Sequence, residues 1–155
     1  MTFRRAAALG LALACGAPAG ACELVLSEHR SGRELLRLPL DAAQPTFEIV
    51  FEHSVLGTTV VDRYVPRRDG AGWRAHLVEE RFRGEGYGLP HAAGPGETLQ
   101  RDGDGWRLSL DRVVDPLVVL PLPAQQMRVR AGGREQLLGE LSTRSVALRV
   151  SGCAG

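Results

Sequence analysis

The chain has 155 residues and nearly equal numbers of basic (19) and acidic (18) residues, so its length predicts one domain and its charge provides no basic block for nucleic acid. Only 5% of the residues are aromatic, which leaves few rings on which bases could stack. Every basic residue is arginine, which excludes a Schiff-base lysine and the lysine of a phosphate-binding loop. We expect neither a nucleic-acid partner nor a cofactor.

The first 21 residues have the layout of a secretory signal peptide. Two arginines precede an apolar run over residues 6–14, and small residues follow up to Ala21. The apolar run is much shorter than the roughly 20 residues of a membrane-spanning helix. We therefore expect residues 1–21 to be removed, and residues 22–155 to form a single all-β domain that is periplasmic or secreted and has no transmembrane span.

Cysteine positions allow two interpretations of how the mature chain is fixed. Cys15 lies in the predicted signal, whereas Cys22 and Cys153 lie at the two ends of the mature chain and predict a disulfide in an oxidising compartment. The alternative is a lipoprotein anchored through Cys22 ("AGAC") or Cys15 ("ALAC"). Both boxes lack the usual leucine three residues before the cysteine, so the disulfide is favoured.

Alternation of apolar and polar residues predicts β-strands in chain order. The first clear pattern places Phe47, Ile49, Phe51, His53 and Val55 on one face. Similar alternation recurs at residues 106–111, 127–130 and 146–151. About ten short strands with turns between them predict a single antiparallel β-sandwich or barrel.

Turn signals divide these strands. Asp-Gly pairs in "RRDGAGW" and "RDGDGW" predict hairpins that lead into Trp73 and Trp106, and we expect both tryptophans to pack in the core. The prolines of "DPLVVLPLP" favour an edge strand or a crossing segment. The best helical candidate is short and lies near residues 42–46. Residues 83–99 are rich in glycine and predict a loop, which at this length in a small domain is often functional.

His53 is the first candidate site residue, with Ser54 beside it. Its phase points it inward or to the core edge, where it is either a structural donor to a carbonyl or carboxylate, or part of a site. Adjacent strand residues point apart, so we do not expect Ser54 and His53 to act directly as nucleophile and base.

Two acids are predicted to approach His53. A hairpin at residues 56–58 would bring Asp62 beside it, and Glu79 is in phase with Trp73 and Leu77 on a partly apolar face. Glycines in the following loop would let it pass close over the pair; the candidate loop residues are Gly86, Gly88 and Pro90. This cluster could position water, hold a polar ligand or fix the fold through hydrogen bonds. No spacing matches a tight metal motif, so we predict no metal ligands.

These same segments carry a family resemblance. "FEIVFEHSVLGTTVVDRY", "EERFRGEGYGLP" and a "DGW" hairpin, in this order after a signal peptide, resemble the bacterial domain-of-unknown-function family numbered 1850. His53, Ser54 and Val55 match its His-Ser-Val motif, and residues 86–90 match its Gly-x-Gly-Leu-Pro loop. Asp62 stands where the family pattern has glutamate, and Tyr87 stands where it has alanine. The resemblance extends over about residues 23–150.

The resemblance implies a role without implying an activity. Genes of this family often accompany tripartite ATP-independent periplasmic transporters for small organic acids. We therefore expect an exported accessory or binding module whose partner is a transporter permease, its binding protein or a small organic acid. The alternatives are a hydrolase-like or metal-assisted envelope enzyme that uses His53 with Asp62 or Glu79, and a structural envelope protein.

Overall fold

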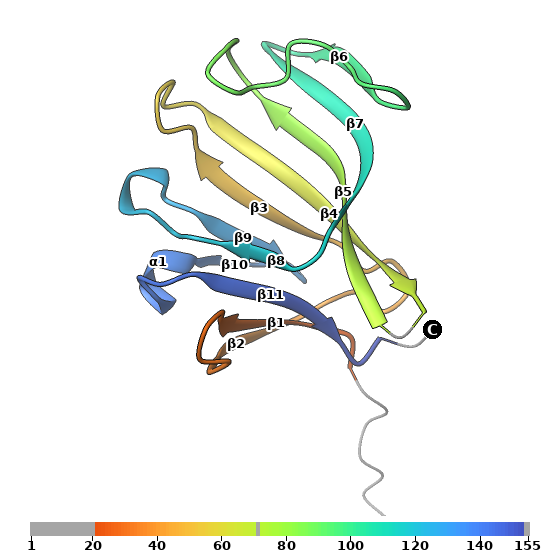
Figure 1. Ribbon diagram of the computed structural model, residues 1–155, viewed down its shortest axis with the longest axis vertical. Helices are drawn as coiled ribbons and strands as arrows, with labels where there is room; N and C mark the ends of the chain where they lie inside the picture. The colour runs from red at the N-terminus through yellow and green to blue at the C-terminus, as the bar shows by residue number, and fades with distance from the viewer. Residues whose placement is uncertain (1–20, 71, 154–155) are drawn as a thin grey trace, which may run out of the picture.

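The computed structural model describes residues 21–70 and 72–153, which form two antiparallel β-sheets packed against each other (Figure 1). The predicted signal peptide and Cys15 lie outside the described residues. The prediction of an all-β, sandwich-like fold is confirmed, with 11 strands in place of the expected ten or so. Among the described residues, no helix has the length and apolar character needed to cross a membrane.

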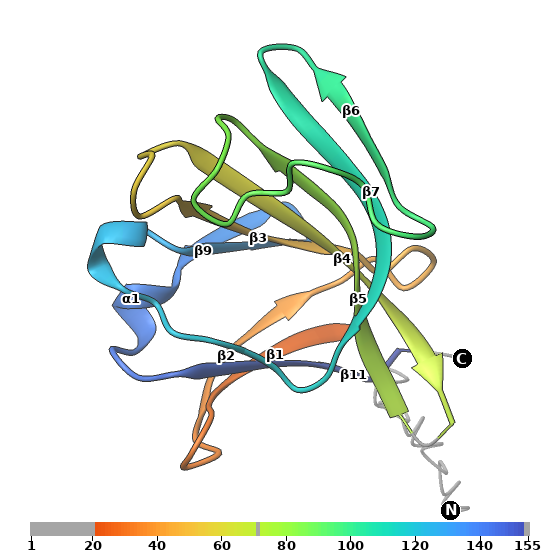
Figure 2. The same cartoon turned by 45° about the horizontal axis from the view of Figure 1, so that its top comes forward.

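The smaller sheet has four strands and the larger has seven. In spatial order, the smaller sheet contains β2 (Glu34–Pro39), β1 (Glu23–Glu28), β11 (Val146–Ser151) and β8 (Leu117–Val119). The larger sheet contains β10 (Arg134–Leu137), β9 (Arg128–Ala131), β3 (Phe47–Glu52), β4 (Thr59–Asp69), β5 (Gly72–Phe82), β7 (Gly105–Val114) and β6 (Thr98–Asp102). The larger sheet curves strongly, and its β6–β7 end extends beyond the smaller sheet (Figure 2).

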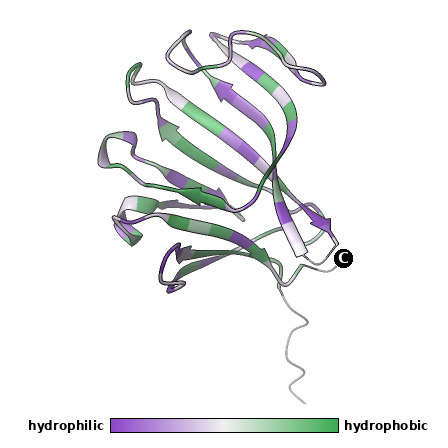
Figure 3. Cartoon of the chain, in the orientation of Figure 1, coloured by the Kyte–Doolittle hydropathy of each residue, from purple (hydrophilic) through white to green (hydrophobic). Residues whose placement is uncertain are grey.

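Alternating side chains of the two sheets build the core. Leu24 and Leu26 on β1, Ile49 on β3 and Val129 on β9 are essentially inaccessible to solvent. Phe47 and Tyr64, which are paired across β3 and β4, stack with ring centroids 5.2 Å apart. The strands of the larger sheet mix hydrophobic and hydrophilic residues (Figure 3), as expected when one face is buried and the other is wet.

Both predicted Asp-Gly hairpins form, but the tryptophans that follow are only partly buried. Asp69 pairs with Gly72 at the β4–β5 turn, and Asp102 pairs with Gly105 at the β6–β7 turn. Trp106 packs against the core, and the Arg101 guanidinium lies over its ring, 4.1 Å from the ring centroid. The prediction that both tryptophans belong to the core is therefore right in part for Trp106. Trp73 stays half-exposed and is not part of the core cluster.

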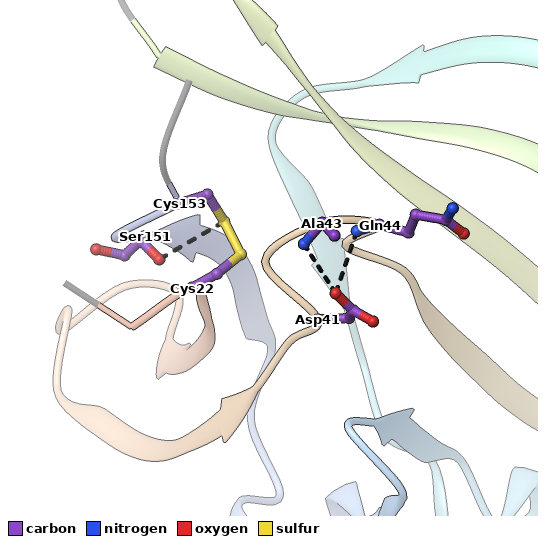
Figure 4. Close-up of a disulfide and its surroundings, with 6 residues drawn as sticks. All are labelled: Cys22, Asp41, Ala43, Gln44, Ser151 and Cys153. Carbon is purple, nitrogen blue, oxygen red and sulfur yellow. Dashed lines mark hydrogen bonds between the residues drawn. A yellow bond between two sulfur atoms is a disulfide. The ribbon is translucent and has the colours of Figure 1, made fainter. Parts of the chain in front are cut away.

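The proline-flanked segment forms β8 at the edge of the smaller sheet, as predicted. The short helix expected near residues 42–46 is absent. Asp41 Oδ1 instead accepts the backbone N–H groups of Ala43 (2.8 Å) and Gln44 (3.3 Å), which fixes a turn (Figure 4). The helical turns of the described chain are a 3₁₀ turn, η1 (Pro123–Gln125), and a single α-helical turn, α1 (Leu138–Leu141).

A disulfide joins Cys22 to Cys153, as predicted from their positions (Figure 4). The β1–β11 register pairs Glu23 with Ser151, so antiparallel pairing brings the two cysteines together just beyond the last rung. Cys22 is buried, and its sulfur is used in this bond. The link closes the smaller sheet at the point where the described chain begins and ends.

Candidate functional site

The turn between β3 and β4 places His53 differently from the sequence prediction. β3 ends at Glu52, and the backbone N–H of His53 donates to the carbonyl of Thr58 (2.8 Å). The N–H of Gly57 donates back to the carbonyl of His53 (2.8 Å), which closes a compact turn over residues 53–58. The strand alternation therefore stops before His53. The inward direction predicted for Val55 is wrong, and its side chain is 61% exposed.

Both ring nitrogens of His53 are engaged by backbone groups. The N–H groups of Val55 and Leu56 each donate to Nδ1 at 3.3 Å. Since Nδ1 accepts, the neutral ring carries its proton on Nε2, which donates to the carbonyl oxygen of Tyr87 at 3.2 Å. The imidazole thus caps its own turn and binds the loop that follows β5. This corresponds to the structural interpretation of His53, with a carbonyl as the acceptor.

Two further contacts hold the turn against the loop. Thr58 Oγ1 donates to the carbonyl of Arg83 at 2.9 Å. A Cβ built on Gly84 would lie only 2.9 Å from Leu56 Cδ1, so the leucine side chain occupies the space that the glycine leaves open. We call residues 53–58 and 83–90, joined by these contacts and by the His53 bond, the His53 junction.

Backbone conformation explains the glycines of the loop. Gly86 and Gly88 adopt φ values of +77° and +93°, and a Cβ on either would meet no atom within 4 Å. They are therefore required for their backbone angles and not for close packing. Between them Tyr87 has a φ of +52°, which presents its ring outward, 70% exposed. Leu89 turns back into the core, and Pro90 follows it half-buried.

Two large apolar side chains are exposed on the junction, among polar and charged residues that include Arg83 and Glu85. Val55 and Tyr87 are both exposed, whereas Ser54 and His91 are exposed polar residues near them in sequence. A hollow of about 450 Å³ adjoins the junction, and its lining includes Thr58, Arg83 and Trp106. Both imidazole nitrogens are already hydrogen-bonded to backbone groups, so in this arrangement neither is free to exchange a proton with a bound molecule.

Asp62 does not reach His53. The β3–β4 register pairs it with Ile49, four residues before His53, and carboxylates are not among the hydrogen-bond partners that the structure gives His53. The predicted hairpin does form, but its turn starts at His53 itself, so Thr59 is the first residue paired with β3. Asp62 therefore lies three rungs beyond the Thr59–Glu52 pair that adjoins the turn.

Glu79 lies on the opposite face of the sheet from the one predicted. A β-bulge at Val78 shifts the β4–β5 register, so that Tyr64 pairs with Leu77 but Arg63 pairs with Glu79. Glu79 therefore faces outward, where it lies 3.4 Å from Arg63 Nη2 and 3.2 Å from Arg81 Nε. Glu48 extends this outer ion-pair network with Arg81 at 2.9 Å.

The bulge turns Glu80 inward in place of Glu79. Glu80 pairs directly with Asp62, so two acids face the apolar inner surface near Tyr64. Burial, with the Glu80 charge as a smaller cause, raises the pKa of Asp62 to about 7. Burial also raises the pKa of Glu80. Asp62 Oδ1 is buried without a hydrogen-bond partner among the described residues, which makes its ionised form costly.

The sequence prediction missed Glu80 and the apolar surface of Val55 and Tyr87. The consecutive acids at residues 79–80 left the register undetermined, and only the bulge decides which one faces inward. Across residues 21–70 and 72–153, the side chains of His, Cys, Asp and Glu form no group of three that could hold a metal ion.

A family model described as Domain of unknown function (DUF1850) matches residues 47–138. The chain belongs to this family. The DUF1850 match begins with β3 and ends just after β10, so it contains the whole seven-stranded sheet, the His53 junction and β8. Strands β1, β2 and β11 and the disulfide lie outside it. No curated protein and no solved structure matches the chain.

Proposed function

We propose that this protein is an exported accessory module of a tripartite ATP-independent periplasmic transporter for small organic acids, and that it works by binding and not by catalysis. The observation that carries the proposal is the use of His53. Both imidazole nitrogens bind backbone groups, so the histidine of the family motif shapes a surface and leaves no base for chemistry.

The surface that it shapes has the composition of a docking site. Tyrosine is enriched at the energetic centres of protein interfaces, and Tyr87 is 70% exposed beside a turn that also exposes Val55. Positive φ at Tyr87 is a strained conformation for a non-glycine residue, and the His53 bond to its carbonyl helps to hold it. The patch is small, which favours a transient contact with the permease or the binding protein.

The disulfide supports export, since such links persist in oxidising compartments. The organic-acid transporter is taken from the gene associations of the DUF1850 family. The enzyme alternative requires His53 to act with Asp62 or Glu79, and these three side chains lie in the turn, on the inner face and on the outer face respectively. We therefore do not propose it.

A photo-crosslinking amino acid at position 87, introduced in the native host, tests the docking surface. Irradiation is expected to join the protein to a permease or binding-protein subunit. The same amino acid at Val113, an exposed residue on β7, provides the control and is expected to give no such product. Uptake of organic acids should fall in Tyr87→Ala cells and remain normal in Val113→Ser cells. Normal uptake in a strain that lacks the whole protein would overturn the proposal.

A further inference from the structure

A second hollow lies at one end of the smaller sheet, and its lining comes from the β1–β2 turn, the segment before β11 and the residue that follows β8. The last rung there aligns Glu28 of β1, Val146 of β11 and Val119 of β8. Beyond this rung, the N–H of His29 donates to the carbonyl of Ser145 at 2.8 Å, which ties the β1–β2 turn to the segment before β11. The hollow measures about 640 Å³, within the roughly 300–1,000 Å³ range of small-molecule sites.

Arginine side chains give this hollow an excess of positive charge. Arg30 and Arg144 line it, and Arg33 lies behind Glu28, which is the single carboxylate of the lining. Glu28 is already occupied: its oxygens accept Arg33 Nη2 at 2.7 Å and Ser31 Oγ at 2.8 Å. Those bonds, Arg33 first, lower the pKa of Glu28, so it is ionised and neutralises one guanidinium only.

Arg30 and Arg144 are therefore available to a ligand. Arg144 makes only a long ion pair with Glu28, with Nη1 3.9 Å from Oε2, and its side chain is 79% exposed. Within the described chain Arg30 has neither an ion pair nor a side-chain hydrogen bond. Guanidinium groups match carboxylates in shape, with paired N–H donors for paired oxygens. Ser31 and Ser145 add polar groups to the lining.

The remaining wall is apolar. Leu120 lines the same hollow and is 47% exposed, so a bound molecule with a short carbon skeleton would cover it. An inorganic anion would use the arginines and leave the leucine in water. A cation is disfavoured by the charge balance.

We infer that this hollow binds a small organic anion, with a carboxylate between Arg30 and Arg144 and its carbon skeleton against Leu120. The inference goes beyond the proposed docking role, because it assigns a ligand to a different surface. It does not require the His53 junction to contact a transporter, and docking does not require this ligand.

Calorimetric titration of the oxidised, exported protein with succinate tests the inference. We expect a dissociation constant of about 1 mM or tighter, and at least about tenfold weaker binding for Arg30→Gln and for Arg144→Gln. Arg68→Gln, an exposed arginine on β4, is the matched control and should bind as the wild type does. Succinamide, which lacks the charges, should not bind.

Two further titrations separate the chemical parts of the site. Leu120→Ser should weaken succinate binding but not phosphate binding, and phosphate should bind the wild type more weakly than succinate. Two results would overturn the site. One is the absence of binding heat at a succinate concentration about ten times the expected dissociation constant. The other is equal affinity for succinate in Arg30→Gln, Arg144→Gln and the wild type. Equal affinity for phosphate and succinate would overturn the assignment of an organic anion. Because the assay contains no transporter, none of these results bears on the docking proposal.

Discussion

His53 and Tyr87, 34 residues apart in sequence, are joined by a hydrogen bond of 3.2 Å between the imidazole Nε2 and the tyrosine carbonyl oxygen. The other ring nitrogen caps the turn in which His53 lies. One side chain therefore stabilises two segments that have no regular secondary structure. This arrangement makes the two functions of the ring separable by substitution.

His53→Asn and His53→Gln are predicted to have different effects. The asparagine Oδ1 can replace Nδ1 and cap the turn but cannot reach the loop, whereas the longer glutamine can donate to Tyr87 and leaves the turn uncapped. Each variant should lose about 1–2 kcal/mol of stability in denaturant melts. Limited proteolysis should cut residues 83–90 faster in His53→Asn than in His53→Gln. Equal cleavage of both variants at wild-type rates would show that the Nε2 bond does not hold the loop.

Gly84→Ala is predicted to destabilise the junction more than Gly86→Ala. Both residues have positive φ, so each substitution carries a conformational cost of about 1 kcal/mol. Only at Gly84 does the new methyl group also meet a side chain, Leu56 Cδ1 at 2.9 Å, which adds an overpacking cost of about 1–3 kcal/mol.

A double-mutant cycle with Leu56→Ala tests the origin of that difference. The truncated leucine should relieve the clash, so Gly84→Ala should destabilise the Leu56→Ala protein less than it destabilises the wild type. Denaturant melts of the four proteins give the coupling. Additive effects would show that Leu56 moves aside freely and that the contact does not fix the loop.

Sequence alternation predicted the strands well because the sheets have one buried face. Phe47 and Ile49, or Val146 and Leu148, occupy the core in the phase that their spacing predicts. The disulfide was also predictable, because Cys22 and Cys153 are the two cysteines that lie outside the predicted signal peptide.

The prediction was wrong where the backbone departs from regular pairing. Alternation continues in the sequence through His53 and Val55, but the turn begins at His53, and its hydrogen bonds are made to backbone groups that carry no sequence signal. The bulge at Val78 similarly exchanges the faces of Glu79 and Glu80. A one-residue change of phase reverses every later side chain, so the inner acid was misassigned.

Removal of the Cys22–Cys153 disulfide is predicted to lower stability substantially. The bond spans 131 residues, and a loop of this size corresponds to a loss of up to about 5 kcal/mol on the chain-entropy model. A Cys22→Ser/Cys153→Ser double variant should melt like the reduced wild type, and reductant should not change its melt. Intact mass after alkylation should show no free thiol in the oxidised wild type. A lipid on Cys22 or an alkylated Cys153 would contradict the link.

Asp62 is predicted to make stability fall as pH rises. Its pKa is raised from 3.8 to about 7 in the fold, so between these values the folded chain binds a proton that the unfolded chain has released. The contribution of Asp62 to the free energy of unfolding is therefore greatest below about pH 4. It declines as the pH rises to about 7 and does not change above that. A shift of three units corresponds to about 4 kcal/mol, and partial exposure of Asp62 reduces the expected change to about 1–3 kcal/mol.

Other titratable and charged groups lie near Asp62, so variants are needed to assign the pH dependence of stability to this residue. Glu80 on β5 and Tyr64 on β4 share its surroundings, whereas Arg112 on β7 favours the ionised form of Glu80. Asp62→Asn should remove most of the decline between pH 5 and 8 and should be more stable than the wild type at pH 8. Asp111→Asn is the matched control with the opposite sign, because bonds from His76 and Arg67 lower the pKa of Asp111, so its contribution to stability is present at neutral pH and lost in acid. A wild-type melt that is level from pH 5 to 8, with Asp62→Asn no more stable at pH 8, would show that Asp62 is ionised in the fold without penalty.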